Sequence, residues 1–423
     1  MTLQALAFVA RYALTNPFVD EWDFVHALYG EEPALPWLWA LHNEHRFPLP
    51  RVLYLLVFWL THDLRAGCYV SLFGVSLLSL GLIRLSRNVR GHASLTDAVF
   101  PMLLLHAGQA ENVYMGYQMV FMMSLVLACG QLAAVVSTTD GNQFRRGLQV
   151  AFMGAASLMC GASGLAYGAG GLVWVGWLAV GGKLTRPQRF VLAPFVLLVP
   201  AYITLYRTGY RRPAHHPPSA GVWESVRVGL EAQSLAVGPS ATGIWPFIGV
   251  VMFVLGVGTF VVIAKNLMGG KDKPQWWGMM AMLAGSAGVS FGIGWGRSGF
   301  EDDMGFAWRY GWITVPALLT MWFAALRDGA RWADRFLWVF AAGVLVMTPI
   351  NVASGFLDGE KRRSLIDREW EEWVRAGKSP EEIAQRFYPD DAPEVRERMV
   401  SAMLVLKKNR YTYYELLREG DPP

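Results

Sequence analysis

The sequence predicts an all-α, polytopic membrane protein of about 11 transmembrane helices. Of its 423 residues, 53% are hydrophobic and only 17% are charged, whereas roughly a quarter of the residues in soluble domains carry a charge. The charges are also clustered, so that long windows of the chain contain almost none. A helix needs about 20 mostly apolar residues to cross a bilayer, and several of these windows are long enough to do so.

Eleven segments have the apolar character of membrane spans. They lie near residues 3–15, 66–83, 95–108, 118–137, 147–161, 163–181, 190–206, 242–264, 276–295, 307–326 and 334–352. Residues 50–62 are also apolar, but this run is short for a span. Its length favours a juxtamembrane helix that lies at the interface.

The placement of basic residues orients these spans, because Lys and Arg concentrate in cytoplasmic loops. With residues 16–65 placed outside, the five basic clusters of the connecting loops all fall on the cytoplasmic side. The clusters lie at residues 84–90, 145–146, 183–189, 265–273 and 327–335. The acidic and histidine-containing loops then share the exterior side.

Two further segments are expected outside the bilayer. Residues 353–423 are far more charged than residues 1–352, and "SPEE" at 379–382 is a helix start with Ser379 as cap and Glu382 reaching back. We therefore expect a transmembrane domain over 1–352 and a small helical exterior domain over 353–423. In the loop 207–240, Trp223, Val226 and Leu230 share one helical face, which predicts a helix lying on the bilayer surface.

The predicted exterior segments gather ionisable and polar side chains near the ends of the spans. The net charge of +4 forms no basic face with interleaved aromatic residues, so we expect no nucleic-acid partner. The candidate site residues are Asp20, Glu21 and Asp23; Glu44, His45 and Arg46; Gln109, Glu111 and Asn112; Arg211, His215 and His216; and Arg297, Glu301, Asp302, Asp303, Arg309 and Tyr310.

Ordinary loop polarity is the simplest explanation for any one of these residues, since clustered charges are often structural. Together they also suit a chemical site. The planar guanidinium of arginine binds oxyanions such as phosphate in a bidentate manner. Carboxylates beside it suit a general base or a metal held near that phosphate. His42 and His45 could equally hydrogen-bond the turn before Pro48.

The order of motifs in roughly the first 110 residues resembles the GT-C superfamily of membrane glycosyltransferases. "DEWDF" at 20–24, "EHRFPL" at 44–49 and "LIRLSR" at 82–87 follow the pattern of its protein O-mannosyltransferase and aminoarabinose-transferase branch. Asp23 and the pair His45-Arg46 depart from that pattern. The chain also resembles bacterial polytopic membrane proteins with the motifs "HNEHR", "HHP", "GR..F" and "RY", found here at 42–46, 215–217, 296–300 and 309–310.

The GT-C resemblance implies a GT-C-like transmembrane catalytic domain in the cytoplasmic (inner) membrane, with its site facing the exterior. The implied activity is inverting transfer of a sugar from a polyprenyl-phosphate donor to a lipid, glycan or protein acceptor. Asp20 would act as general base, with Glu21 or Asp23 as alternatives. Arg297 and Arg309, with Arg46 and Arg211, would bind the phosphate. His216 and Tyr310 would join them in binding the substrate or its phosphate.

The remaining candidates have less defined roles under this resemblance. Glu44 and His45 would either orient the arginines or join Asp20 in holding a divalent cation, Mg or Mn. Gln109, Glu111 and Asn112 would line the sugar cavity.

Other functions remain open from the sequence. A lipid-linked oligosaccharide polymerase or ligase would use the loop 207–240, and a lipid or glycan transporter or a scaffold is also compatible with the composition. Internal repeats and mid-membrane acids, which are frequent in transporters, are not evident in the sequence. Convergence of Asp20, Glu44 and Arg297 in one exterior cavity with a side opening toward the lipid would favour transfer chemistry, whereas a water path across the bilayer would favour transport.

Overall fold

The computed structural model describes residues 1–213, 216–270, 273–300, 303–389 and 393–418. This part of the chain is helical, with an isolated β-bridge between His42 and His45. The α-helices of its first half are α1 (Thr2–Tyr12), α2 (Val25–Leu28), α3 (Ala34–Trp39), α4 (Pro48–Thr61), α5 (Ala66–Arg90), α6 (Val99–Leu104), α7 (Ala110–Val113), α8 (Met119–Val136), α9 (Gln143–Leu158) and α10 (Gly161–Gly181). Those of the second half are α11 (Arg186–Leu192), α12 (Leu198–Arg207), α13 (Val222–Ser234), α14 (Phe247–Gly269), α15 (Lys273–Arg297), α16 (Tyr310–Asp328), α17 (Arg331–Arg362), α18 (Trp370–Arg375), α19 (Pro380–Phe387) and α20 (Pro393–Lys408).

Seven helical segments in the described residues are long and apolar enough to cross a membrane, as expected for a multi-pass membrane protein. They are Ala66–Arg90, Gly116–Val136, Gly161–Gly181, Arg186–Arg207, Phe247–Gly269, Lys273–Arg297 and Arg331–Arg375. The apolar run predicted to be juxtamembrane forms the shorter helix α4.

The other four predicted spans take different forms. Helices α1 and α9 have 11 and 16 residues, and α16 has 19 residues that are almost all buried. The expected continuous helix over 95–108 is wrong, because α6 ends at Leu104, directly before the polar stretch that begins at His106. The chain continues there through a short 3₁₀ turn, Ala107–Gln109, and α7.

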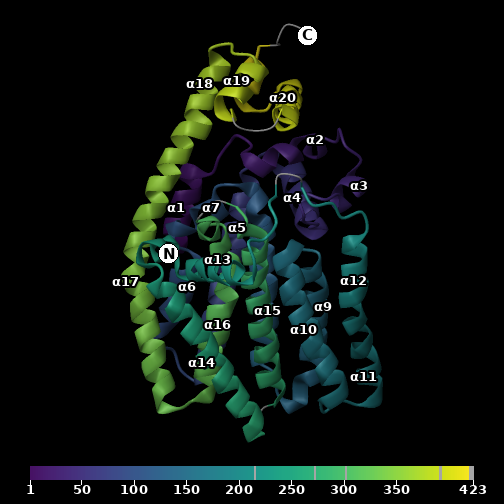
Figure 1. The fold of residues 1–423 in the computed structure, drawn as a ribbon, viewed down its shortest axis with the longest axis vertical. Coiled ribbons are helices and arrows are strands. Elements are labelled where there is room, and N and C mark those ends of the chain that lie inside the picture. Colours follow the sequence, from purple (N-terminus) through teal and green to yellow (C-terminus); the bar gives the residue numbers. More distant parts are fainter. Residues whose placement is uncertain (214–215, 271–272, 301–302, 390–392, 419–423) are drawn as a thin grey trace.

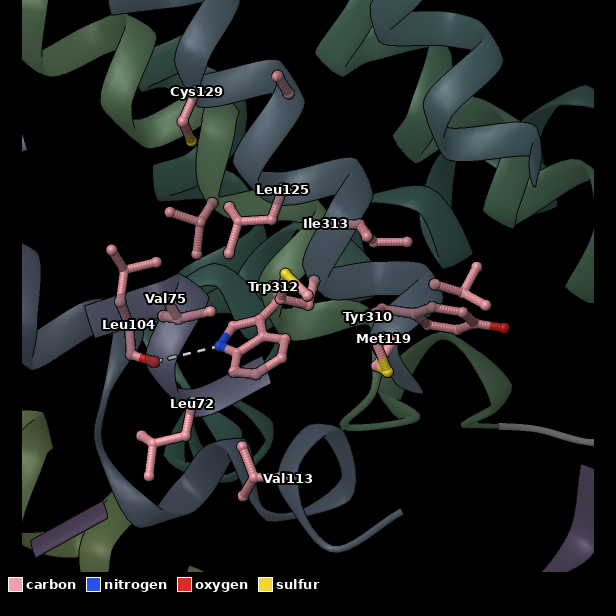
Figure 2. Packing of buried hydrophobic residues seen from close by; sticks show 14 of the residues in the cluster. Leu72, Val75, Leu104, Val113, Met119, Leu125, Cys129, Tyr310, Trp312 and Ile313 are labelled. Atoms are coloured by element: carbon pink, nitrogen blue, oxygen red, sulfur yellow. Dashed lines mark hydrogen bonds between the residues drawn. The ribbon is translucent and has the colours of Figure 1, made fainter. Parts of the chain in front are cut away.

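Helix α16 lies at the centre of the bundle and packs against α8, α14, α15 and α17. An apolar residue occupies nearly every side of it, which is the pattern of a helix buried all round. Figure 2 shows Trp312 of this helix among apolar side chains, with its indole N–H donating to the carbonyl of Leu104 at 3.2 Å. This bond satisfies the one polar group that Trp312 brings into the core.

Helix α13 is a packed part of the bundle rather than an isolated surface helix. Its apolar face exists as predicted, and Trp223 is 84% exposed. A different face, with Ser225 and Gly229, packs on α15, where Gly229 approaches the backbone of Ser290 so closely that an added Cβ would lie 2.6 Å from the Ser290 carbonyl oxygen. Glycine therefore permits a contact that the amphipathic pattern alone does not predict.

The C-terminal helices α18, α19 and α20 form a small unit on top of the first loop, which comprises residues 16–65 (Figure 1). Helix α17 runs through the predicted boundary at residue 352 and continues, by way of a π-helical segment Arg363–Glu369, into α18. Trp370 of α18 stacks on Trp22 of the first loop, with ring centroids 5.3 Å apart. The predicted cap is present, since Ser379 Oγ accepts from the Glu382 N–H at 3.2 Å.

Asn16 fastens this C-terminal unit to the start of the first loop. Its side chain is fully buried. Its Oδ1 accepts from the hydroxyls of both Tyr413 and Tyr414, and its Nδ2 donates to the carbonyl of Ile366 at 2.5 Å. One amide thus satisfies three buried polar groups that come from two segments of the C-terminal unit.

We expect Asn16→Ala to destabilise the C-terminal unit by about 2–4 kcal/mol, because it leaves buried hydroxyl and carbonyl groups without partners. Limited proteolysis of the detergent-purified protein should then cut residues 353–423 faster than in wild type. Asn409→Ala is the matched control, since Asn409 is exposed and bonds only the carbonyl of Val405 in its own helix turn. Equal proteolysis of both variants would contradict the assigned role of Asn16.

Candidate functional site

A cavity of about 340 Å³ lies where the first loop meets the ends of α8, α10, α15 and α16. It is at the end of the bundle that faces α2, α3 and α4 in Figure 1. The sequence-predicted residues that line it are Asp20, Glu44, His45, His216, Arg297, Arg309 and Tyr310. Segments more than 250 residues apart in the sequence therefore converge on one hollow.

Glycines of α15 make room on one wall of the cavity. Gly288, Gly292 and Gly296 repeat every four residues, so they lie on one face of the helix. A Cβ added at Gly292 would meet no other atom within 4 Å. This wall is therefore apolar and open, whereas the wall formed by the first loop is ionisable.

Asp20 reaches the cavity from a 3₁₀ helix, Val19–Phe24, which also carries Asp23. With three residues per turn, positions 20 and 23 lie on the same side of this helix. The imidazole of His42 lies between them, with Nε2 3.1 Å from Asp20 and Nδ1 3.4 Å from Asp23. Both ring nitrogens can donate only when the imidazole is protonated.

The protonation of this trio follows from its contacts. Burial alone would lower the pKa of His42, but the hydrogen bonds and charges of Asp20 and Asp23 raise it to about 9. Burial likewise acts to raise the pKa of Asp20, but the hydrogen bond from His42 and the charges of Arg309 and Arg297 bring it below its usual range. At neutral pH, Asp20 is therefore a carboxylate held against an imidazolium.

The "HNEHR" stretch forms a tight turn that carries Glu44 and His45 to the cavity. The backbones of His42 and His45 exchange two hydrogen bonds of 2.9 Å, and Asn43 has the left-handed φ of +49° that such a turn requires. Glu44 at its tip contacts the imidazole of His216 and lies 3.8 Å from both Arg297 and His45. Burial lowers the pKa of His45 to about 4, so this ring is neutral.

The two cavity arginines are held in different ways. Arg297 Nε donates to the hydroxyl of Tyr310 at 3.0 Å, and its guanidinium lies over the ring of Phe300, 5.2 Å from the centroid. Arg309 donates to Glu111 from both its side chain and its backbone N–H, each at 3.0 Å. Among the residues that the structure describes, the carboxylate that Arg297 approaches is that of Glu44, at 3.8 Å, whereas Arg309 has a close ion pair with Glu111.

Several predicted site residues lie outside the cavity. Arg46 is buried and donates to the carbonyls of Trp39, Tyr206 and Thr208, so its guanidinium is already occupied by the backbone. Arg211 is exposed. Gln109 and Asn112 are buried and bond each other at 3.1 Å. His215, Glu301 and Asp302 lie outside the described residues.

Glu21 also points away from the cavity. Its carboxylate is 2% exposed and accepts from the hydroxyl of Tyr54 at 3.1 Å and the N–H of Tyr117 at 3.0 Å. Burial raises the pKa of Glu21 to about 7 despite these bonds. The 3₁₀ geometry that directs Asp20 and Asp23 to His42 therefore directs the side chain of Glu21 into the protein interior.

The donor groups do not fit the metal interpretation. Among the residues that the structure describes, no three His, Cys, Asp or Glu side chains are arranged to hold a metal ion. Asp20 faces His42 and Glu44 faces His216, so Asp20, Glu44 and His45 do not form a common ligand set.

Sequence reasoning missed His42 as the partner of both aspartates. It also missed Phe300 and Tyr117, which line the cavity beside Arg297 and Asp20. A signal for His42 was available, because an Asn-Glu pair between two histidines indicates a two-residue turn and the aspartates at 20 and 23 share a 3₁₀ spacing.

Comparison with protein-family models, with curated proteins and with solved structures gives no match for this chain.

We expect His42→Gln to lower stability in a pH-dependent manner. The folded pKa of His42, about 9, exceeds its ordinary value of 6.5. The imidazolium therefore stabilises the fold fully below about pH 6.5, and this stabilisation, on the order of 3 kcal/mol, disappears as pH rises through about 9.

Thermal unfolding of both proteins in detergent between pH 6 and pH 10 measures this difference. The gap between wild type and variant should be largest near pH 6 and shrink toward pH 10. Parallel curves would show that the imidazole carries no charge between the two aspartates.

Proposed function

We propose that this protein is a GT-C-like membrane glycosyltransferase that moves a sugar from a polyprenyl-phosphate donor to an acceptor hydroxyl. The observation that carries the proposal is the cavity in which the carboxylate of Asp20 faces two guanidiniums, Arg297 and Arg309. Sugar transfer from a lipid phosphate needs both a base for the acceptor proton and cations for the leaving phosphate.

The membrane arrangement of the proposal extends the seven long apolar helices. Helices α1, α9 and α16 and the broken segment at 95–104 would complete eleven crossings of the cytoplasmic (inner) membrane. The cavity would then face the periplasm or cell exterior, and residues 353–423 would cover it from outside. The open glycine face of α15 would allow the lipid part of the donor to remain in the bilayer while its phosphate enters the cavity.

Arg297 is the better placed phosphate ligand of the two arginines. Tyr310 and Phe300 fix its guanidinium plane, and the nearest carboxylate oxygen in the described part of the chain, on Glu44, is 3.8 Å away. A phosphate can therefore approach without first breaking a close ion pair. Arg309, paired with Glu111 at 3.0 Å, would supply positive charge from the second side.

Asp20 is the better placed base of the three acids in the first loop. Its side chain is 37% exposed and lines the cavity, whereas Glu21 is buried and Asp23 also pairs with Arg398 at 3.0 Å. In the proposed step Asp20 takes the acceptor O–H proton, and the acceptor oxygen bonds to the anomeric carbon from the face opposite the phosphate. The carbon–oxygen bond to the phosphate breaks, and its electron pair leaves with the lipid phosphate toward Arg297.

A lipid-linked oligosaccharide polymerase or ligase is the second candidate. His216, from the large loop 207–240, lines the cavity and contacts Glu44. Such an enzyme would transfer several sugars at once, so the length of the transferred glycan distinguishes it from a transferase of single sugars.

We expect Asp20→Asn to reduce transfer by about 10²–10⁴-fold, the usual contribution of a general base. The assay uses protein in lipid, radiolabelled polyprenyl-phosphate sugars and membrane extract as acceptor. Asp63→Asn is the matched control, because Asp63 lies in the same loop but pairs with Arg65 outside the cavity. Retained transfer in Asp20→Asn would remove Asp20 as the base, and no transfer by wild type with any donor would count against the enzyme class.

We expect Arg297→Gln to weaken donor use by about 10–100-fold, since a hydrogen bond to a charged group contributes about 1.5–3 kcal/mol. The comparison measures transfer as a function of polyprenyl-phosphate sugar concentration. Arg65→Gln changes the same charge at a site outside the cavity and should leave the dependence unchanged. An equal effect of both variants would indicate a general electrostatic contribution rather than contact with the phosphate.

A further inference from the structure

A second hollow lies between α5, α8 and α9, far from the cavity described above. It has a volume of about 630 Å³. Helix α8 contributes Val120 and Phe121 to the first cavity and Ala133, Ala134 and Ser137 to this groove. At 1.5 Å per residue, the two regions of α8 are separated by roughly 20 Å along the helix. The groove therefore lies toward the opposite end of the bundle.

The polar rim of the groove contains two arginines and no carboxylate. Arg84, Asn88, Ser137, Arg146 and Gln149 are its polar lining residues. Arg84 is exposed and has no hydrogen bond or ion pair within the described part of the chain. Arg146 donates from Nη1 to Gln149 at 2.9 Å. Its Nε is buried and has no hydrogen-bond partner among the residues that the structure describes.

A buried guanidinium nitrogen without a partner is costly, because its desolvation is not compensated. The guanidiniums of Arg84 and Arg146 therefore offer N–H donors to a molecule bound in the groove. Such donors match the oxygens of a phosphate, which accept charge-assisted hydrogen bonds from arginine. The positive-inside rule explains why arginines are at this end, but it does not explain why two of them line one hollow.

The rest of the groove is apolar. Leu85, Phe152 and Met153 line it together with the small residues Gly130 and Ala133. Phe152 is 64% exposed, and an atom added at Gly81 would meet nothing within 4 Å. A groove that combines two guanidiniums with an apolar lining matches a molecule with a phosphate at one end and a hydrocarbon chain at the other.

We propose that the groove between α5, α8 and α9 binds an anionic phospholipid, with Arg84 and Arg146 on its phosphate and an acyl chain along α8 and α9. This site is independent of the proposed transfer chemistry. It shares no lining residue with the first cavity, and its ligand is a resident bilayer lipid.

The test measures lipid retention by native mass spectrometry of the whole protein in uncharged detergent with equimolar phosphatidylglycerol and phosphatidylcholine. Wild type should retain phosphatidylglycerol preferentially. The double variant Arg84→Gln/Arg146→Gln should lose about tenfold of this retention, because charge-assisted bonds to phosphate are removed. Arg87→Gln/Arg145→Gln, which makes the same charge change outside the groove lining, should remain within about twofold of wild type.

A steric variant keeps the proposal testable if the charge variant does not fold. Gly81→Leu fills the groove without changing charge, and it should also reduce phosphatidylglycerol retention. Elution as a single species and an unchanged unfolding temperature establish that each compared variant is folded. Equal losses in the two charge variants, equal retention of phosphatidylcholine, or full retention by Gly81→Leu would overturn the proposal. Displacement of the lipid by glycerol 1-phosphate would assign the groove to a soluble phosphate instead.

Discussion

The imidazole of His42 between Asp20 and Asp23 is the interaction on which the candidate site depends. The carboxylates of Asp20 and Asp23 lie one 3₁₀ turn apart and repel each other, and because their side chains are 37% and 34% exposed, water screens this repulsion only in part. One imidazolium, 3.1 Å from the first and 3.4 Å from the second, resolves the repulsion for both. It leaves the remaining face of Asp20 toward the cavity and directs Asp23 toward Arg398 of the C-terminal unit.

The cavity and the C-terminal unit therefore both depend on the position of the first loop. The first loop is fixed from outside by Trp370 on Trp22, by Arg398 on Asp23 and by Tyr413 and Tyr414 on Asn16. It is fixed from below by the contacts of Glu21 with Tyr54 and Tyr117. A loop held on both sides keeps its functional groups in place, which is what a preorganised site requires.

The sequence was informative where a local pattern decides the structure. Apolar windows predicted the long helices, and the sequence SPEE at 379–382 predicted the helix cap at Ser379. The charge clusters at the ends of predicted spans contained some of the residues that line the cavity and others that lie outside it. The directions in which individual side chains point could not be predicted from such local patterns. Asp20, Glu21 and Asp23 have similar chemistry, and only the 3₁₀ backbone separates the two that meet His42 from the one that is buried. Arg46 was predicted to bind phosphate, but its guanidinium donates to backbone carbonyls. Every residue has a backbone carbonyl, so the sequence does not indicate which carbonyls a side chain will meet.

The arginines of the cavity and those of the groove differ in whether a carboxylate lies near them. This difference affects what each site can bind. In the first cavity Arg309 has a carboxylate at 3.0 Å and Arg297 has one at 3.8 Å, so an arriving anion must compete with groups of the protein. In the groove between α5, α8 and α9, the lining residues that the structure describes include no carboxylate to compete. Competition weakens binding of the free anion, which suits a substrate that must leave after each cycle. Its absence suits a lipid that stays, because only continuous occupation compensates for the unpaired donor of Arg146.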